Sequence, residues 1–286
     1  MTTNVLITGA NKGIGRATVA AVLEARDDAL VLLGARDDGR GGAARDALVA
    51  EHPAWRERIE VIQLDVSDVA SVQAAAKRVG ERHERLYGLV NNAGIGLGSA
   101  DLKGVLDVNT FGPKRVCDAF VPLVTDRVVN VSSASGPNFV SGCSDERRLQ
   151  LTNPEVTWQQ VETFIDEALA VEDGDFAAVG MGGGNAYGMS KACLNAYTIH
   201  LAREYPELII NACTPGYIAT DLTLPASSKG ADPASMGMKS PAEGTKASLH
   251  LLFGEPGGSG WYFGSDAERS PLDRYRSPGD PPYRGD

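Results

Sequence analysis

The sequence predicts an α/β fold in which a doubly wound, mainly parallel sheet is covered by helices on both faces. Short runs rich in Val, Ile and Leu alternate with longer amphipathic stretches, a pattern typical of repeated strand–helix units. The short runs are apolar on both faces, as expected for strands buried on both sides. Right-handed crossovers between parallel strands bring their carboxyl ends to one edge, where ligands bind in such folds.

The expected elements follow in order along the chain. Strands are predicted over residues 4–8, 29–34, 59–64, 86–91, 127–133 and 208–214, with a short final strand near 260–264. Helices are predicted near 14–26, 40–51, 68–84, 104–124 and 187–204. A further helix is expected from Ser240, a favourable N-cap, with Pro241 at the first helical position. The length of 286 residues suits one large domain or two small ones, and we expect a single domain over 1–286.

A stretch of about forty residues (144–185) interrupts the alternation before the helix at 187–204, and we expect it to be a helical insertion. Asn153 is the expected N-cap of its main helix, with Pro154 at the first helical position. Four apolar residues recur there at helical spacing and are assigned to packing: Trp158, Val161, Ile165 and Leu169.

Two further segments lack periodicity. Residues 223–240 are small and polar, and they form either a lid over a substrate site or a mobile loop. Residues 254–286 are rich in Pro and Gly, which predicts an irregular tail that is extended over the surface or partly disordered.

Composition excludes several function classes. Lys and Arg number 27 against 37 Asp and Glu, and this net charge of −10 argues against a nucleic-acid partner. No apolar run is long enough to span a membrane, and no signal peptide is visible at the N-terminus, so we expect a cytoplasmic location. The four cysteines and four histidines show no metal-binding spacing, which predicts reduced thiols and no metal site.

A glycine-rich turn joins the first strand to the first helix. Gly9, Gly13 and Gly15 permit a tight turn and let the backbone approach a pyrophosphate at the helix N-terminus. The remaining loop residues assigned to cofactor binding are Asn11, Lys12 and Ile14. The Gly-x-x-x-Gly-x-Gly spacing resembles the glycine motif of short-chain dehydrogenase/reductases, which implies a Rossmann fold with a nicotinamide cofactor.

The end of the second strand indicates which nicotinamide is bound. An NAD enzyme normally has an acidic residue there to hold the ribose 2′-hydroxyl, whereas this chain has Gly34. Arg36 and Arg40 follow, and with Lys12 they form a cationic set suited to a 2′-phosphate, which favours NADP(H). The adjacent Asp37 and Asp38 either point away or partly neutralise these arginines.

Further stretches resemble the same family's sequence marks, in the same order, from Val5 to about Leu222. The resemblance implies that these residues contact the cofactor: Asp65, Val66, Asn92, Ala93, Gly94, Pro215, Gly216, Ile218 and Thr220. The glycine loop, the segment after the second strand and the long insertion are most similar to the monomeric NADPH-dependent carbonyl reductase branch. In that branch the insertion covers an oligomer face, so the resemblance also implies a monomer.

Tyr187 and Lys191 lie four residues apart, which places them on one face of a helix. That spacing alone allows either a catalytic pair or two polar side chains without a role in catalysis. An unperturbed tyrosine has a pKa of about 10, and a neighbouring cation would lower it. The resemblance assigns both residues to catalysis and to cofactor contact, with Ser133 bound to the substrate oxygen and Asn109 holding a relay water. The motif match selects Ser133 over Ser132.

The sequence constrains the identity of the substrate less than that of the cofactor. Candidate pocket residues are Ser135, Phe139, Tyr217 and Leu222. The resemblance implies that an aromatic at 217 lines the pocket, which suits apolar or aromatic carbonyl compounds. The expected activity is NADPH-dependent reduction of an aldehyde, ketone or quinone to an alcohol, with Tyr187 as proton donor. The alternatives are an alcohol or steroid dehydrogenase acting in the oxidising direction and a non-catalytic NADP-binding sensor.

Overall fold

The computed structural model describes residues 2–96, 100–183, 185–224 and 232–285. Its eight strands are β1 Thr3–Ile7, β2 Ala29–Ala35, β3 Ile59–Gln63, β4 Leu86–Asn91, β5 Val124–Val131, β6 Ile209–Cys213, β7 Tyr262–Phe263 and β8 Arg269–Ser270. They form one sheet in the order β3-β2-β1-β4-β5-β6-β7-β8. All neighbours pair in parallel except β7 and β8, which are antiparallel. The predicted α/β sheet is therefore confirmed, with the antiparallel edge strand as an addition.

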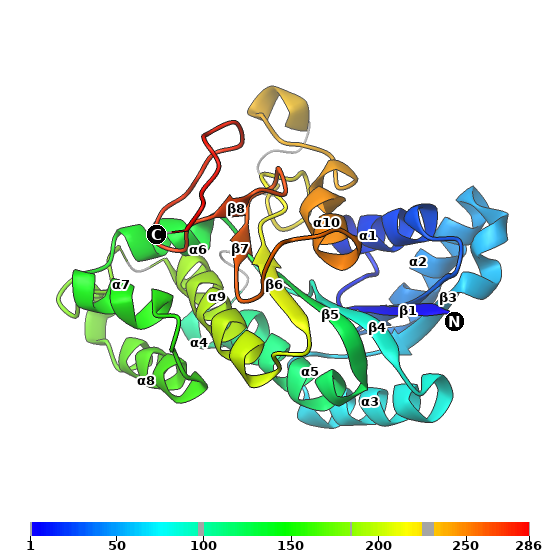
Figure 1. The fold of residues 1–286 in the computed structure, drawn as a ribbon, viewed down its shortest axis with the longest axis horizontal. Helices are drawn as coiled ribbons and strands as arrows, with labels where there is room; N and C mark the ends of the chain where they lie inside the picture. The colour runs from blue at the N-terminus through cyan, green and yellow to red at the C-terminus, as the bar shows by residue number, and fades with distance from the viewer. Residues whose placement is uncertain (1, 97–99, 184, 225–231, 286) are drawn as a thin grey trace.

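Ten α-helices in the described part of the chain surround the sheet (Figure 1). They are α1 Gly13–Ala25, α2 Asp38–Glu51, α3 Val69–His83, α4 Leu102–Leu106, α5 Gly112–Phe120, α6 Ser135–Ser141, α7 Asp145–Thr152, α8 Trp158–Leu169, α9 Ala186–Glu204 and α10 Lys246–Phe253. The predicted helix at 104–124 is divided by a π-helical turn over Asp107–Phe111. None of the described helices is long and apolar enough to cross a membrane.

Two apolar cores lie on opposite faces of the sheet. Alternate residues of β1 show this division, because Val5 and Ile7 face one core and Leu6 faces the other. The first core contains apolar residues of α1, α2 and α10, and the second contains residues of α3, α5 and α9. The four cysteines, Cys117, Cys143, Cys193 and Cys213, are all buried and free.

The insertion forms a third core against α9. Val161, Phe164 and Ile165 of α8 are fully buried there, beside Met189 and Cys193 of α9. Figure 1 shows α7 and α8 outside α9, on the side away from the sheet. The insertion thus covers the helix that carries Tyr187 and Lys191.

Two details of the predicted insertion helix are wrong. Helix α8 begins at Trp158 rather than at Pro154, because Thr157 and Gln160 form a capping box. Asn153 instead ends α7, and its side chain accepts a hydrogen bond from the Glu155 amide at 2.8 Å. The predicted packing role of Leu169 is also wrong, since its side chain is 41% exposed.

The two segments without periodicity contain more order than expected. The short strand predicted near 260–264 is β7, and it extends the sheet beside β6. In the predicted substrate loop at 223–240, residues 225–231 lie outside the described residues. The described end of this loop returns to the segment after β6, where Lys239 pairs with Ile218.

Candidate active site

The strand order reverses between β1 and β4, so the glycine loop after β1 and the turn after β4 meet at the carboxyl edge of the sheet. Gly9 has a φ of +64°, and a Cβ there would lie 2.8 Å from the Cα of Ala93. A Cβ on Gly15 would lie 2.5 Å from the Nδ2 of Asn92 and from the carbonyl oxygen of Gly9. These close approaches explain why the loop needs glycine at both positions.

Asn92 holds the glycine loop in place. Its Nδ2 donates to the carbonyl oxygens of Thr8 at 2.9 Å and of Gly9 at 3.2 Å. The Thr8 hydroxyl in turn accepts from the backbone amides of Asn92 and Ala93, both at 3.0 Å. The side-chain amide of Asn92 therefore stabilises the conformation of the glycine loop.

Helix α1 begins directly after this loop. Lys12 is its N-cap residue, and no side chain caps the helix. The first-turn amides of α1 are thus left without a side-chain acceptor, which suits the anion site expected at this helix end. Asn11 lies in the turn and Ile14 in the first helical turn, both half-buried.

The two arginines after β2 are exposed, and neither guanidinium forms an ion pair within the described residues. The Asp37 carboxylate accepts from the backbone amide of Arg40 at 2.8 Å and caps α2, and it forms no ion pair with either guanidinium. A Cβ on Gly34 would lie 2.9 Å from the Ile7 carbonyl, so β2 closely approaches the end of β1 just before the glycine loop. Arg36 and Arg40 are therefore free to meet a ligand anion.

Asp65 and Val66 follow β3 at the same edge. The Asp65 carboxylate accepts from the amide of Ser67 at 3.0 Å and from its hydroxyl at 2.6 Å. Val66 is buried against Gly112 of α5, where a Cβ would lie 3.0 Å from the valine Cγ2. Asp65 lies at the predicted edge, whereas the Val66 side chain packs in the interior.

Ser133 and Ser132 have different surroundings after β5. The buried Ser132 hydroxyl donates to the Lys191 carbonyl at 3.3 Å. Ser133 is half-buried, its hydroxyl accepts from the Ser135 amide at 3.1 Å, and it lies near the Tyr187 hydroxyl. The choice of Ser133 over its neighbour agrees with this geometry.

Tyr187 and Lys191 lie in the first two turns of α9 and face the same region. The Lys191 ammonium is 5.8 Å from the centre of the Tyr187 ring and donates to the Val131 carbonyl at 2.9 Å. Burial raises the pKa of Tyr187, while the nearby Ser133 hydroxyl lowers it. The prediction that Lys191 lowers this pKa is not borne out in this structure, where burial is the largest effect.

Lys191 is itself only 4% exposed, and burial lowers its pKa to about 8. Asn109 is completely buried in the π-helical turn. Its side chain accepts from the Ile95 amide at 2.9 Å and donates to the Ile95 carbonyl at 3.0 Å and to the Ser190 hydroxyl at 3.1 Å. A Cβ on Gly94 would lie 3.2 Å from the Asn109 Oδ1 and 3.7 Å from the Lys191 Nζ. The two side chains therefore meet beside Gly94.

The segment after β6 completes this edge. Gly216 has a φ of +95°, and a Cβ there would lie 3.1 Å from the Ser265 Cβ. Pro215 is half-buried beside it, while Ile218 is buried at 1% exposure. Thr220 faces the glycine loop, because a Cβ on Gly13 would lie 3.4 Å from its Cγ2.

The described residues predicted to bind substrate divide into two groups. Tyr217 and Leu222 are 53% and 42% exposed, and Ser135 is half-buried near Ser133. Phe139 is only 6% exposed and packs edge-on against Phe164 of the insertion, with ring centres 6.4 Å apart. Its ring therefore belongs to the third core in this structure.

Comparison with known proteins agrees with this geometry. The family model for short chain dehydrogenases matches residues 3–144. Carbonyl reductase [NADPH] 1 from Bos taurus is 32% identical over 265 residues, which cover 86% of this chain and 89% of that protein. The chain belongs to the short-chain dehydrogenase/reductase family.

Plant relatives are also similar to this short-chain dehydrogenase/reductase. The (+)-neomenthol dehydrogenase of Arabidopsis thaliana is 31% identical over 253 residues, covering 76% of this chain and 83% of that protein. The structure of menthone neomenthol reductase from Mentha piperita superimposes with a TM-score of 0.73 at 27% identity, covering 93% of this chain and 99% of that one. The chain is therefore an oxidoreductase of a family that uses nicotinamide cofactors.

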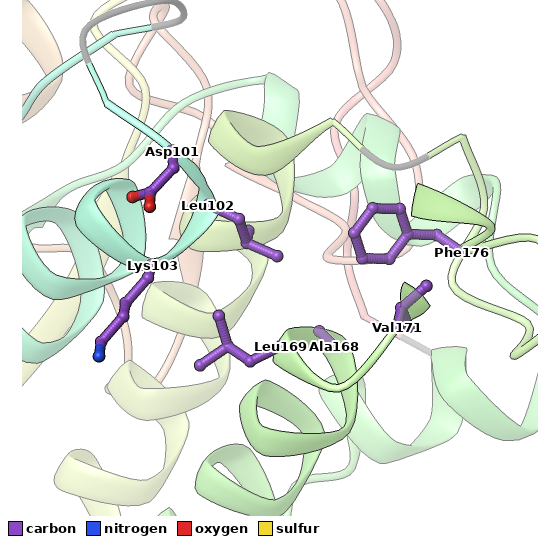
Figure 2. Close-up of a pocket in the computed structure, with 7 residues that line it drawn as sticks. All are labelled: Asp101, Leu102, Lys103, Ala168, Leu169, Val171 and Phe176. Carbon is purple, nitrogen blue, oxygen red and sulfur yellow. The ribbon is translucent and has the colours of Figure 1, made fainter. Parts of the chain in front are cut away.

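This short-chain dehydrogenase/reductase also has a surface pocket that was not predicted from the sequence. A surface pocket of about 490 Å³ lies between the start of α4 and the end of α8 (Figure 2). Apolar side chains of Leu102, Leu169 and Phe176 surround it, with Asp101 and Lys103 at the α4 side. The helical spacing of Leu169 indicated packing, so no sequence signal located this pocket, and it shares no residue with the predicted catalytic set.

Proposed function

We propose that this short-chain dehydrogenase/reductase is an NADPH-dependent carbonyl reductase. The observation that supports it is the convergence of Ser133, Tyr187, Lys191 and Asn109 beside the glycine loop at one sheet edge. All four are polar side chains, and they come from three parts of the chain: the segment after β5, the π-helical turn and α9. Such a grouping is what proton transfer to a carbonyl oxygen requires.

The residues of the glycine loop and those that follow β2 suit the binding of a dinucleotide. Gly9 and Gly15 leave the backbone open where a side chain would collide, and the α1 N-terminus presents amides suited to the pyrophosphate. Arg36 and Arg40 suit a 2′-phosphate, which favours NADP(H) over NAD(H). When bound, NADPH supplies the hydride for the reduction.

Tyr187 would donate the proton to the carbonyl oxygen. Its raised pKa keeps the phenol neutral at physiological pH, so the proton is present when a substrate arrives. Ser133 would donate a hydrogen bond to the same oxygen and stabilise the negative charge that develops on it. Tyr187 thereby loses a proton while the substrate becomes an alcohol.

Lys191 and Asn109 would support this transfer. Lys191, held at the Val131 carbonyl, is positioned to stabilise the phenolate that remains and to hold the cofactor ribose. Asn109 fixes the turn at Gly94 and Ile95, and beside it we place the water that would return a proton to Tyr187 through Lys191. A monomeric state and a cytoplasmic location belong to the same proposal.

The names of the relatives support the reaction class and leave its direction to be tested. One relative is a carbonyl reductase [NADPH] and another a neomenthol dehydrogenase. The second name favours the alternative, an alcohol dehydrogenase that oxidises its substrate.

The test is a substrate panel of quinones, keto esters, aldehydes and steroids, with NADPH and NADH oxidation followed by absorbance. We expect NADPH to be preferred, and Tyr187→Phe to lower kcat by about 10²- to 10⁴-fold while NADPH still binds. Tyr205→Phe, at the far end of α9, is the matched control and should keep full activity. Unchanged turnover in Tyr187→Phe would contradict the mechanism, and faster turnover of alcohols with NAD⁺ would favour the alternative.

A further inference from the structure

A second surface pocket, of about 570 Å³, lies between the C-terminal part of α9, the β7–β8 edge of the sheet and the connection from α7 to α8. Its apolar lining includes Ile199 and Ala202 of α9 and Leu272 of the C-terminal tail. Ile199 follows Tyr187 by twelve residues in α9, or about 18 Å along the helix axis. This pocket, here called the tail pocket, shares no residue with the candidate active site and is separate from it.

Three arginines and two carboxylates line the tail pocket. Arg274 pairs with Asp273, with 3.1 Å between Nη1 and Oδ1. Arg203 lies 3.7 Å from the Glu155 carboxylate and also donates to two backbone carbonyls. Arg269 has no carboxylate partner in the described part of the chain. The positive charge that the pocket leaves for a ligand is therefore that of Arg269.

Two aromatic rings and a backbone carbonyl hold the Arg269 guanidinium. Its Cζ is 3.9 Å from the centre of the Trp261 ring and 5.3 Å from the centre of the Tyr283 ring. Its Nη1 donates to the Arg284 carbonyl at 3.2 Å. A guanidinium stacked on aromatic faces keeps its other N–H donors in its own plane, where they match the two oxygens of a carboxylate. The stack thus fixes a donor suited to a small flat anion.

Ser270, next to Arg269 in β8, also lines the tail pocket. Its side chain is only 2% exposed, and its Oγ has no hydrogen-bond partner among the described residues. A buried hydroxyl without a partner costs free energy, so native proteins rarely retain one without a reason. A ligand oxygen in the pocket would supply the missing partner.

We propose that the tail pocket binds a small aromatic carboxylate, with Arg269 and Ser270 as its polar contacts. The guanidinium would donate to both carboxylate oxygens and the hydroxyl to one of them. The ring of the ligand would lie against the apolar side chains of α9 and Leu272. Glu155 and Asp273 in the same pocket favour a singly charged carboxylate over a doubly charged phosphate. This site goes beyond the proposed function and does not depend on it.

The test is an NMR titration with 2-naphthoate that follows the indole N–H signals of the three tryptophans. Trp261 lines the tail pocket, whereas Trp55 and Trp158 do not. We expect only the Trp261 signal to shift, with a Kd of about 0.1–1 mM that saturating NADPH leaves unchanged. The neutral 2-naphthamide and the doubly charged 2-naphthyl phosphate should each bind about five-fold more weakly or worse.

Three variants test the residues. Arg269→Gln should weaken the binding of 2-naphthoate about ten-fold or more, because the charged donor is lost. Ser270→Ala should weaken it about three-fold without lowering the Tm, because the hydroxyl that it removes has no partner in the free protein. Arg274→Gln is the matched control in the same pocket. It should change the Kd less than about two-fold, since its guanidinium is already paired with Asp273.

A Trp261 signal that stays unmoved at about 10 mM 2-naphthoate would overturn the proposal. Equal affinities in wild type and Arg269→Gln would overturn it as well, and if that variant did not fold, an unchanged affinity in Ser270→Ala would do so. Tighter binding of the phosphate than of the carboxylate would overturn the ligand class. None of these results bears on carbonyl reduction, which the substrate panel and Tyr187→Phe test separately.

Discussion

Lys191 is a buried cation at the centre of the candidate active site. Its ammonium is buried with one hydrogen bond, to the Val131 carbonyl, and without a carboxylate partner among the described residues. A buried cation of this kind is unfavourable for folding, and its lowered pKa measures that cost. The protein retains a destabilising group at the place where proton transfer is proposed.

Lys191→Met should therefore stabilise the protein while it removes activity. The pKa falls from 10.5 to about 8, which corresponds to on the order of 3 kcal/mol of destabilisation below pH 8. The Val131 carbonyl loses its partner in the variant, so a net gain of about 1–2 kcal/mol is expected at pH 7.

The difference in stability between wild type and Lys191→Met should change with pH in one direction. Between pH 8 and about 10 the unfolded chain binds more protons at this lysine than the folded chain, so wild-type stability gains on the variant as pH rises. Urea unfolding of both proteins at pH 7 and pH 9.5 checks this. A variant less stable than wild type at pH 7, with a gap that does not depend on pH, would show that burial of the charge costs little.

At the scale of residues, the spacing of side chains was predicted correctly from the sequence, but the direction of the Tyr187 pKa shift was not. Four-residue spacing correctly predicted that Tyr187 and Lys191 share a face, because helical geometry is local. The direction of the Tyr187 pKa depends on burial by elements distant in the chain, which spacing does not encode. The packing of Phe139 in the third core was not predicted for the same reason, since its partner Phe164 comes from the insertion.

At the scale of elements, α8 of the insertion depends on its N-terminal cap. The Thr157 hydroxyl accepts from the Gln160 amide at 3.3 Å, and the Gln160 side chain accepts from the Thr157 amide at 2.9 Å. Together these bonds satisfy two helix-end donors that would otherwise lack partners. The cap thereby helps to seat Val161 and Ile165 against α9.

Thr157→Ala should lower the stability by about 1 kcal/mol, or roughly 2–4 °C in Tm. Thr163→Ala in the same helix is the matched control, because its exposed hydroxyl only bonds the Gln159 carbonyl four residues back. Thermal unfolding by circular dichroism compares the two, and equal losses would mean that the cap adds nothing.

The same cap shows where element prediction succeeded and failed. The helix itself was predicted, because its apolar residues recur at helical spacing. Its start was misplaced, because Asn153-Pro154 and Thr157-x-x-Gln160 are both good start signals, and the capping box forms at the second. The π-helical turn at Asp107–Phe111 was not predicted, since nothing in the local sequence separates it from an α-helix.

At the scale of the whole molecule, the C-terminal tail is anchored by a buried ion pair. The Arg276 guanidinium, 6% exposed, donates to the Asp266 carboxylate at 2.6 and 2.8 Å. Asp266 lies in the turn between β7 and β8, next to Ser265, which contacts Gly216 after β6. The tail is thereby joined to the segment that borders the candidate active site.

Arg276→Met should destabilise the protein by about 2–4 kcal/mol, because it leaves the Asp266 carboxylate partly buried without its partner. Adding Asp266→Asn should recover part of that loss, since the uncompensated charge is then removed. Urea unfolding of wild type, both single variants and the double variant measures the coupling. Additive losses would show that the two side chains stabilise the tail independently.

The overall architecture was predicted from alternation of strand and helix patterns, but the path of the tail was not. Its Pro and Gly content correctly indicated irregular backbone around β7. The buried position of Arg276 depends on a partner in a preceding turn and on the course of the chain between them. Charged residues in such a segment are ordinarily solvated, so composition alone favours the wrong environment for this arginine.

The burial of the four thiols determines how they react with electrophilic carbonyl compounds. Burial raises the pKa of every one of them, that of Cys213 to about 11 and that of Cys117 to about 12. An ionised thiolate is the nucleophile that attacks quinones and other electrophilic carbonyl compounds, and a raised pKa keeps the four cysteines protonated at neutral pH. Burial and protonation together thus protect these four thiols from alkylation by the class of molecule that the protein is proposed to reduce.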